Sequence, residues 1–241
     1  MTAILAFDTS GEMMHVGLRI DAQAWVHEAA GGAKASAELL PAILALLTRA
    51  GATLADLDAI GFGRGPGAFT GLRTACSVAQ GLALGAGKPV LAIDTLMAVA
   101  EDARQGAQQM QVWATTDARM DQIYAAQYRR LHGQWAVLDA PMLTSVDELN
   151  QIWRGAPPRH IAGNALAAFA ERLETASAQC YGAAAPRGAG LLVLAQTLWE
   201  AGAVLDAGAA MPSYVRDKVA QTVAERSAAK HTAEASGGSG A

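Results

Sequence analysis

A short polar turn follows the first apolar segment of the chain and is the first candidate for chemistry. Residues 3–9 have the composition of a buried strand that ends on a carboxylate, so that Asp8, Thr9 and Ser10 lie together where the turn begins. Carboxylate and hydroxyl oxygens at such a turn are suited to Mg²⁺ and a phosphate, as one half of a phosphoryl-transfer site. The alternative is a plain turn in which Asp8 and Ser10 bond their own backbone.

A glycine-rich segment, residues 61–73, is the second candidate. It holds five glycines, a proline, two arginines and a threonine. Because glycine takes positive φ at little steric cost, this backbone can turn tightly and point N–H groups outward. A strand-like stretch leads into it and helical spacing follows from Leu72, the order found in anion-binding loops. Gly65 and Gly67 are thus candidate phosphate-binding residues. The alternative is a tight surface turn that a partner protein recognises.

Several other chemistries lack their sequence patterns. No Gly-Lys-Ser/Thr follows a glycine run, the five histidines form no His-Glu-x-x-His pair, and no Gly-x-Ser-x-Gly elbow occurs. Cys76 and Cys180 match no metal spacing and are expected to be reduced and buried. We therefore predict no metal site, and the absence of an evident nucleophile or general base argues against an enzyme.

Composition narrows the choice of partners and compartment. The chain has 241 residues, 52% of them hydrophobic and 17% charged, which is typical of a globular protein of one or two domains. A formal net charge of −4 argues against binding nucleic acid without help, since such proteins carry a basic face. Without a secretory signal or a long apolar run, we expect a cytoplasmic protein that avoids the membrane.

The elements that position these residues occur in two similar sets. The strand at residues 3–9 is followed by a half-buried alternating strand to residue 20, and a strand ending on Asp117 is followed by another at 123–128. Asp8 and Asp117 therefore hold equivalent places in two hairpins, which suggests two subdomains of similar plan. The other predicted elements are a strand at 88–94, a helix capped by Thr95, a strand at 160–163, and helices near 166–176 and 191–201.

A leucine-rich helix is predicted at residues 36–50. Its apolar stripe is wider than a helix resting on one sheet requires. Either the helix is sandwiched inside the core, or half of the stripe faces another chain. The stripe consists of Leu39, Leu40, Ile43, Leu44, Leu46 and Leu47.

Taken together, several stretches resemble the TsaB (YeaZ) family of bacterial accessory subunits in making N6-threonylcarbamoyladenosine at position 37 of tRNA. They are residues 5–10 (LAFDTS), 38–41 (ELLP), 63–73 (GRGPGAFTGLR), 80–83 (QGLA), 116–119 (TDAR) with Tyr124, and 214–216 (YVR). The resemblance runs in order from residue 5 to about 220. The third stretch is long and specific, whereas each of the others alone is weak.

The resemblance implies an α/β fold of the actin/Hsp70/sugar-kinase (ASKHA) type, with two RNase-H-like subdomains that each have a mixed sheet flanked by helices. We place the subdomains at 1–106 and 107–224, with a late helix able to pack on the first, and a disordered tail at 225–241. The paralogue TsaD carries the transfer chemistry on a metal held by a His-x-x-x-His pair. Thr95 and Val99 stand at those positions here, so this chain is expected not to catalyse the transfer. The family often has a histidine where this chain has Ala35.

The resemblance also implies partners. The helices at 36–50 and 70–85 are expected to pack against the matching pair of TsaD as a four-helix bundle, and to form a homodimer when alone. The ATPase TsaE, which uses ATP, would join the complex, TsaC would supply threonylcarbamoyl-adenylate, and tRNA would be bound only through the complex. No cofactor is expected on this chain. The expected partner-binding residues are Leu39, Leu40, Ile43, Leu44, Leu47, Thr70, Arg73, Thr74, Ser77 and Val78.

The expected function is that of a non-catalytic scaffold, required for threonylcarbamoyl transfer to adenosine 37 of tRNAs that read ANN codons. The glycine segment would then aim the second helix at the partner. One alternative is an ATP- and Mg²⁺-dependent phosphotransferase or ATPase of the sugar-kinase type, with Asp8 on the metal. A metallopeptidase-like activity is a more distant alternative.

Overall fold

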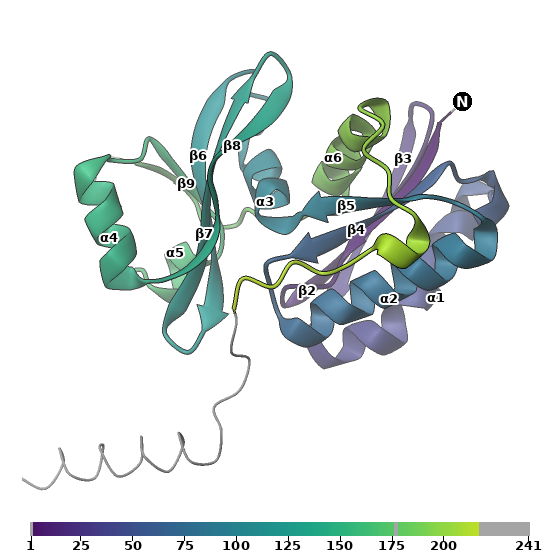
Figure 1. Ribbon diagram of the computed structural model, residues 1–241, viewed down its shortest axis with the longest axis horizontal. Helices are drawn as coiled ribbons and strands as arrows, with labels where there is room; N and C mark the ends of the chain where they lie inside the picture. The colour runs from purple at the N-terminus through teal and green to yellow at the C-terminus, as the bar shows by residue number, and fades with distance from the viewer. Residues whose placement is uncertain (1, 176–177, 217–241) are drawn as a thin grey trace, which may run out of the picture.

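Two five-stranded mixed sheets with the same strand order form the frame of the molecule (Figure 1). The computed structural model describes residues 2–175 and 178–216. The first sheet has the order β3-β2-β1-β4-β5 and the second the order β8-β7-β6-β9-β10. In each, the first three strands in the chain form an antiparallel meander and the last two add in parallel. The strands are β1 (Ala3–Asp8), β2 (Met13–Ile20), β3 (Gln23–Ala30), β4 (Ala59–Gly65), β5 (Val90–Asp94), β6 (Met110–Arg119), β7 (Gln122–Leu131), β8 (Gln134–Ser145), β9 (His160–Ala162) and β10 (Gln179–Tyr181).

The repeated plan predicted from the sequence is confirmed by this topology. Asp8 ends β1 and Asp117 lies near the end of β6, each just before the turn of a hairpin. Two such sheets with flanking helices make an actin-like, RNase-H-like α/β fold of the ASKHA type.

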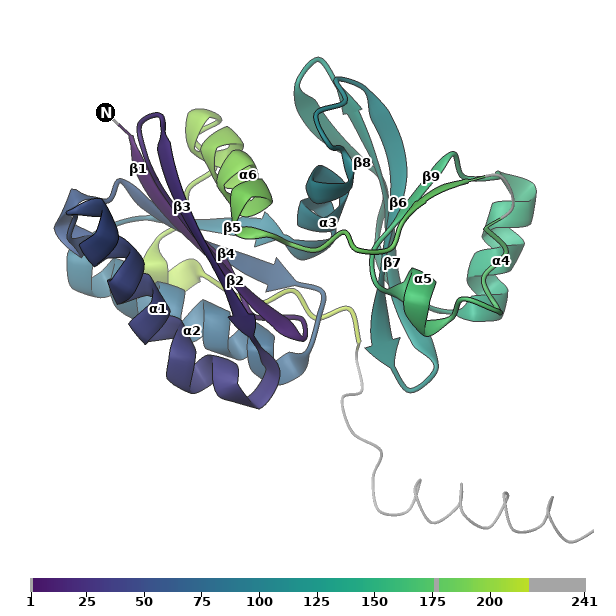
Figure 2. The same ribbon diagram turned by 180° about the vertical axis from the view of Figure 1, so that it is seen from behind.

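Helices cover the sheets on several sides (Figure 2). The first two pack on one face of the first sheet and α6 on the other, α3 lies between the two sheets, and α4 and α5 cover the far face of the second sheet. No helix among the described residues combines the length and apolar content that crossing a bilayer requires. The helices are α1 (Ala35–Ala50), α2 (Phe69–Ala86), α3 (Thr95–Ala103), α4 (Val146–Gly155), α5 (Ala165–Ala168) and α6 (Gly188–Glu200).

The strand β2 is buried on both faces, so the expectation of a half-buried strand was wrong. The helix α6 packs against its second face, and the contact is close because glycines meet there. A Cβ on Gly17 would lie 2.6 Å from the carbonyl oxygen of Gly188, and one on Gly188 would lie 2.5 Å from that of Val16. The late helix thereby completes the core of the first sheet.

The helix α3 is capped by Asp94, not by Thr95 as predicted. Asp94 Oδ1 accepts hydrogen bonds from the backbone N–H groups of Leu96 (2.9 Å) and Met97 (3.2 Å). Asp94 Oδ2 accepts one from the Tyr128 hydroxyl at 2.8 Å, which ties β5 to β7 of the second sheet. Burial raises the pKa of both Asp94 and Tyr128.

Other differences from the sequence prediction lie in the second half. The helix expected near 166–176 is the single turn α5. The elements β8, α4 and β10 were not predicted, although Ser145 and Glu148 form a capping box that was visible as Ser-x-x-Glu. Cys180 is exposed, contrary to expectation, whereas Cys76 is buried. The tail predicted at 225–241 lies outside the described residues.

A segment that we call the C-terminal strap, residues 205–216, runs from the first sheet to the second. Leu205 exchanges two backbone hydrogen bonds of 2.9 Å with Val90, the first residue of β5. The carbonyl of Ala210 accepts a hydrogen bond from Gln80 Nε2 of α2 at 2.9 Å. At the far end, Arg216 Nη2 donates to the carbonyl of Ala118 at 2.9 Å. The strap is therefore hydrogen-bonded to both halves of the molecule.

Candidate functional site

The Asp8 turn is closed by its own hydrogen bonds. Asp8 is fully buried, and its Oδ1 accepts bonds from the backbone N–H of Ser10 (2.7 Å) and from the Ser10 hydroxyl. Its Oδ2 accepts a bond from the Thr95 hydroxyl at 2.7 Å, and that hydroxyl accepts one from the N–H of Gly65 at 3.1 Å. The Thr9 hydroxyl donates to the carbonyl of Gly71 at 2.7 Å. Both carboxylate oxygens are thus engaged within the chain.

The glycine segment is folded around this turn. A Cβ on Gly63 would overlap the Asp8 carboxylate, one on Gly71 would overlap the carbonyl oxygen of Thr9, and one on Gly67 would lie 2.5 Å from the Ser10 Cβ. These glycines are required because the loop and the turn approach each other within backbone contact. The five candidate phosphate-binding residues are therefore brought together, but each is already bonded to or packed against other residues of the chain.

Two glycines of α2 give a matched test of this packing. Gly71→Ala is expected to destabilise the fold by about 3 kcal/mol, because the backbone of Thr9 must move to accommodate the new methyl group. Gly81→Ala adds its methyl group in open space on the same helix and should stabilise the chain by about 0.5–1 kcal/mol. Chemical denaturation of both variants measures the difference. Equal stabilities would contradict the close packing of Gly71.

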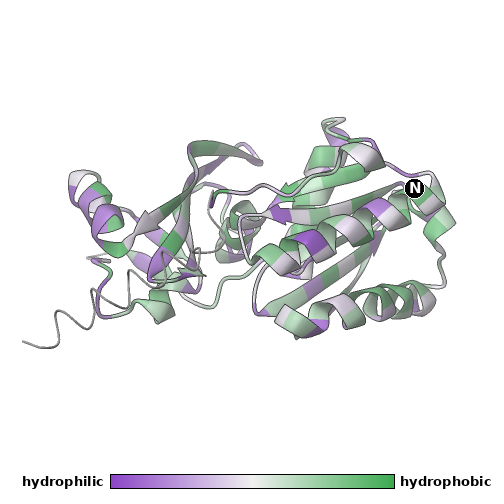
Figure 3. Cartoon of the chain, turned by 60° about the horizontal axis from the view of Figure 1, so that its bottom comes forward, coloured by the Kyte–Doolittle hydropathy of each residue, from purple (hydrophilic) through white to green (hydrophobic). Residues whose placement is uncertain are grey.

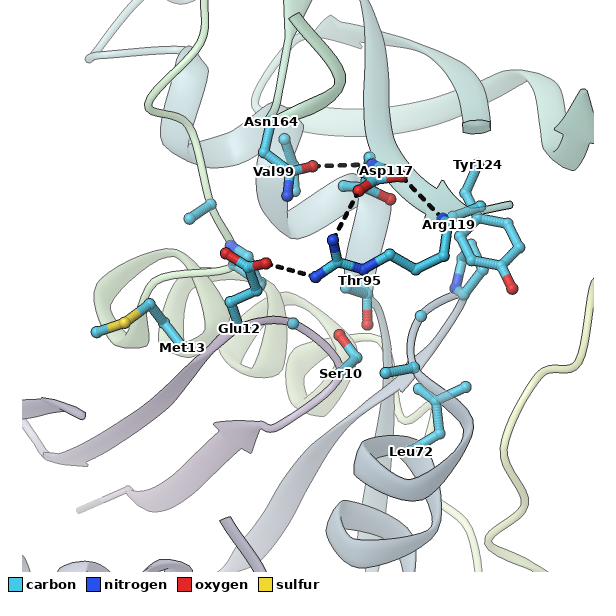
Figure 4. Close-up of a pocket in the computed structure, with 18 of the residues that line it drawn as sticks. Ser10, Glu12, Met13, Leu72, Thr95, Val99, Asp117, Arg119, Tyr124 and Asn164 are labelled. Atoms are coloured by element: carbon cyan, nitrogen blue, oxygen red, sulfur yellow. Dashed lines mark hydrogen bonds and ion pairs between the residues drawn. The ribbon is translucent and has the colours of Figure 1, made fainter. Parts of the chain in front are cut away.

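A cavity of about 550 Å³ lies between the two halves, beside the Asp8 turn. Its lining includes Ser10 and Gly67 on one side and the turn of the second hairpin on the other. Across it, Arg119 Nη2 donates to Glu12, and Arg119 Nη1 lies 3.2 Å from Asp117 Oδ2 (Figure 4). This ion pair spans the two repeats. The sequence did not predict the pair, because 107 residues separate its members.

One buried histidine faces this region with one ring nitrogen that makes no hydrogen bond to the part of the chain that the structure describes. His15 lines the cavity, is 3% exposed, and its Nδ1 makes no hydrogen bond among the described residues. Glu28 Oε1 lies 3.4 Å from that nitrogen. Burial lowers the pKa of His15, more than the nearby carboxylates raise it. Within residues 2–175 and 178–216, no three His, Cys, Asp or Glu side chains are grouped as a metal site would require.

The leucine stripe of α1 is divided between the core and the surface. Leu39 and Ile43 are 0% exposed and Leu47 is 3% exposed, so these three pack inside the chain's own core and do not contact solvent. Leu40 and Leu44, in contrast, are 42% and 48% exposed. The first alternative, a stripe buried in the core, thus describes Leu39, Ile43 and Leu47. The second, a stripe left open to another chain, describes only Leu40 and Leu44.

The remaining predicted partner-binding residues gather along α2. A shallow groove of about 470 Å³ is lined by residues from both helices. Further along α2, Gly81 and Gly85 have open space where a Cβ would stand, and Leu84 is 79% exposed. Figure 3 shows the two helices side by side, with hydrophobic residues prominent along α1. The groove is lined by Ser36, Phe69, Thr70, Arg73, Thr74, Ser77 and Val78.

Several known proteins that this chain resembles carry the names TsaD, TsaB or YeaZ. Residues 17–234 match the model of the family described as TsaD, tRNA N6-adenosine threonylcarbamoyltransferase. Over 127 residues the chain is 40% identical to the tRNA threonylcarbamoyladenosine biosynthesis protein TsaB of Escherichia coli (strain K12), a match that covers 53% of this chain and 55% of that protein. The corresponding protein of Haemophilus influenzae is 39% identical over 127 residues, 53% of this chain and 54% of its own length. The chain thus spans about half the length of the curated relatives that it matches.

A solved structure covers the chain more fully. YeaZ from Pseudomonas aeruginosa superposes with a TM-score of 0.81 at 34% identity, over 89% of this chain and all of that one. A second Pseudomonas aeruginosa structure, described as an uncharacterized protein with similarity to peptidase YEAZ, gives a TM-score of 0.82 at the same identity. It covers 90% of this chain and 100% of its own.

Proposed function

The chain belongs to the TsaB (YeaZ) family of tRNA threonylcarbamoyladenosine biosynthesis, and we propose that it is the non-catalytic subunit that binds and activates TsaD. TsaD would then transfer the threonylcarbamoyl group to adenosine 37 of tRNAs that read ANN codons. TsaC would supply threonylcarbamoyl-adenylate, and the ATPase TsaE would join the pair. The reaction would take place in the cytoplasm, with tRNA held by the complex as a whole.

The observation that carries this proposal is the uncovered outer face of α1 and α2. Leu40, Leu44 and Leu84 are exposed there beside two open glycines, and nothing in the described residues covers them. Glycine inside a helix costs about 1 kcal/mol relative to alanine. At Gly81 the chain's own packing gives no reason for that cost, whereas close approach of a partner helix would. In the absence of TsaD, the same face would pair two copies of this chain.

The state of the polar turn favours a scaffold over a sugar-kinase type of enzyme. A kinase reading needs the Asp8 carboxylate for Mg²⁺, but both of its oxygens accept hydrogen bonds from within the chain. Thr95 and Val99 stand where the family resemblance places the metal-binding histidines of TsaD. The Thr95 hydroxyl is hydrogen-bonded to Asp8 and Gly65, and Val99 has no ligand atom.

The affinity of Gly81→Ala for purified TsaD tests this proposal. The variant is expected to be more stable than the wild type, because alanine favours the helix. It should nevertheless bind TsaD about tenfold more weakly, because the added methyl group separates two closely packed helices. Titration calorimetry measures the affinity and denaturation measures the stability. A wild-type chain that formed no complex with TsaD, or a variant that bound equally well, would contradict the proposed interface.

A further inference from the structure

The arginine in the groove between α1 and α2 is held in a fixed orientation. The guanidinium carbon of Arg73 lies 3.7 Å from the centre of the Phe69 ring, a close cation–π contact. Its Nε donates a hydrogen bond of 3.1 Å to the hydroxyl of Tyr214 in the C-terminal strap. The Phe69 and Tyr214 rings themselves lie 5.4 Å apart. Two aromatic side chains from distant parts of the chain thus support one exposed arginine.

This arginine has no carboxylate partner among residues 2–175 and 178–216. The hydrogen bond to Tyr214 uses only Nε, and the two terminal nitrogens of this exposed, groove-lining side chain form no ion pair with the described residues. Several other arginines of the chain, such as Arg104, Arg154 and Arg187, are each paired with a carboxylate. Arg73 is the one charged residue of the groove lining, and four hydroxyl side chains accompany it.

From this geometry we infer that Arg73 binds a carboxylate of the partner, an aspartate or glutamate on the TsaD helix that packs over the groove. The inference rests on the proposed function and adds the chemistry of its central contact. A guanidinium whose Nε is already engaged can still offer its terminal N–H groups to a carboxylate, and a preordered side chain loses little entropy on binding. The exposed leucines beside it suit a protein helix, whereas a nucleic acid backbone would call for several basic groups.

The strap takes part as a positioning element. Tyr214 contacts Arg73 on one side and lines the cavity between the two halves on the other, and Phe69 lines both the cavity and the groove. Tyr214→Phe keeps the ring and removes only the hydroxyl that holds Nε. We therefore expect Tyr214→Phe to weaken binding of TsaD by about threefold, less than the loss of the arginine itself.

The test compares the salt dependence of TsaD binding between variants. Calorimetry at about 50 mM and about 300 mM salt should show the wild type weakening severalfold, because exposed charge pairs are screened. Arg73→Gln should bind about tenfold more weakly at low salt and lose most of the salt dependence. Arg73→Lys should recover only part of the affinity, since lysine lacks the planar fork. Arg129→Gln, at an exposed arginine of β7, is the matched control and should behave as the wild type.

The outcomes separate this inference from the proposed function. If Arg73→Gln bound TsaD with wild-type affinity and salt dependence while Gly81→Ala was weakened, the carboxylate contact would be refuted and the interface would stand. If the wild-type chain bound no TsaD, both would fall. An equal loss in Arg129→Gln would show a general charge effect and also overturn the inference.

Discussion

Replacing Leu47 by glutamate is expected to unfold the chain, whereas Leu40→Glu, on the same helix, should leave it folded and weaken its binding of TsaD roughly thirtyfold. Leu47 is 3% exposed within the core cluster beneath α1, and Leu40 is 42% exposed. A glutamate at position 47 loses the packing of a leucine and brings a carboxylate into the core. This lowers the free energy of unfolding by about 4 kcal/mol or more. That is a large part of the stability of an ordinary domain.

At the exposed position, Leu40, the substitution is expected to lower the affinity for TsaD and not the stability of the chain. Surface substitutions usually change stability by less than about 0.5 kcal/mol. In the proposed interface, Leu40→Glu would place a charge among apolar side chains, and the loss of a central contact is worth about 2 kcal/mol, or roughly thirtyfold in affinity. Leu131→Glu is the control, because Leu131 is 39% exposed but lies on β7 of the other sheet.

Denaturation curves and TsaD titration decide the outcome for all three variants. We expect Leu47→Glu to lose its folded structure in the denaturation experiment. Leu40→Glu should keep its stability and bind TsaD more weakly, and Leu131→Glu should keep both its stability and its affinity for TsaD. A folded Leu47→Glu chain would contradict the burial of that side chain. Normal binding by Leu40→Glu would remove α1 from the interface.

The leucine stripe shows what periodicity can and cannot predict. Spacing alone predicted a helix and an apolar surface wider than one sheet needs, and both are present. It could not tell which leucines point to the core. That depends on the rotation of the helix against the sheet, which the packing with β2, β3 and α2 sets.

The glycine segment shows a similar division. Its composition predicted a tight turn before a helix, and β4 and α2 flank such a turn. The reason for Gly63 and Gly71 is the Asp8 turn, more than 50 residues away in the chain. The glycine composition predicts outward N–H groups suited to phosphate, whereas in the structure the N–H of Ala68 donates to the carbonyl of Ser10. Contacts between distant segments of this kind have no local signal.

The second large effect is expected at a buried ion cluster centred on Glu101 of α3. Glu101 is 5% exposed and accepts hydrogen bonds from Arg104 (2.6 Å), from Trp135 Nε1 (2.7 Å) and from Arg130 (3.3 Å). Arg130 belongs to β7 and Trp135 to β8, so this carboxylate joins α3 to the second sheet. The sequence does not indicate this cluster, because a lone glutamate in a helix is usually solvated.

Glu101→Ala is expected to lower stability by about 3–5 kcal/mol, because Arg130 and the indole N–H would remain buried without a partner. Glu174→Ala is the matched control. Its carboxylate also pairs with an arginine, Arg154, but both side chains are largely exposed, so little change is expected. Thermal unfolding of the two variants measures the contrast, and similar melting temperatures would contradict the cluster's role.

Because Glu101 lies where α3 meets the second sheet, hydrogen exchange in the Glu101→Ala variant should also become faster in β7 and β8 before it does so in β1 and β4. A loss confined to α3 would show that the carboxylate stabilises its own helix and not the joint between the two halves.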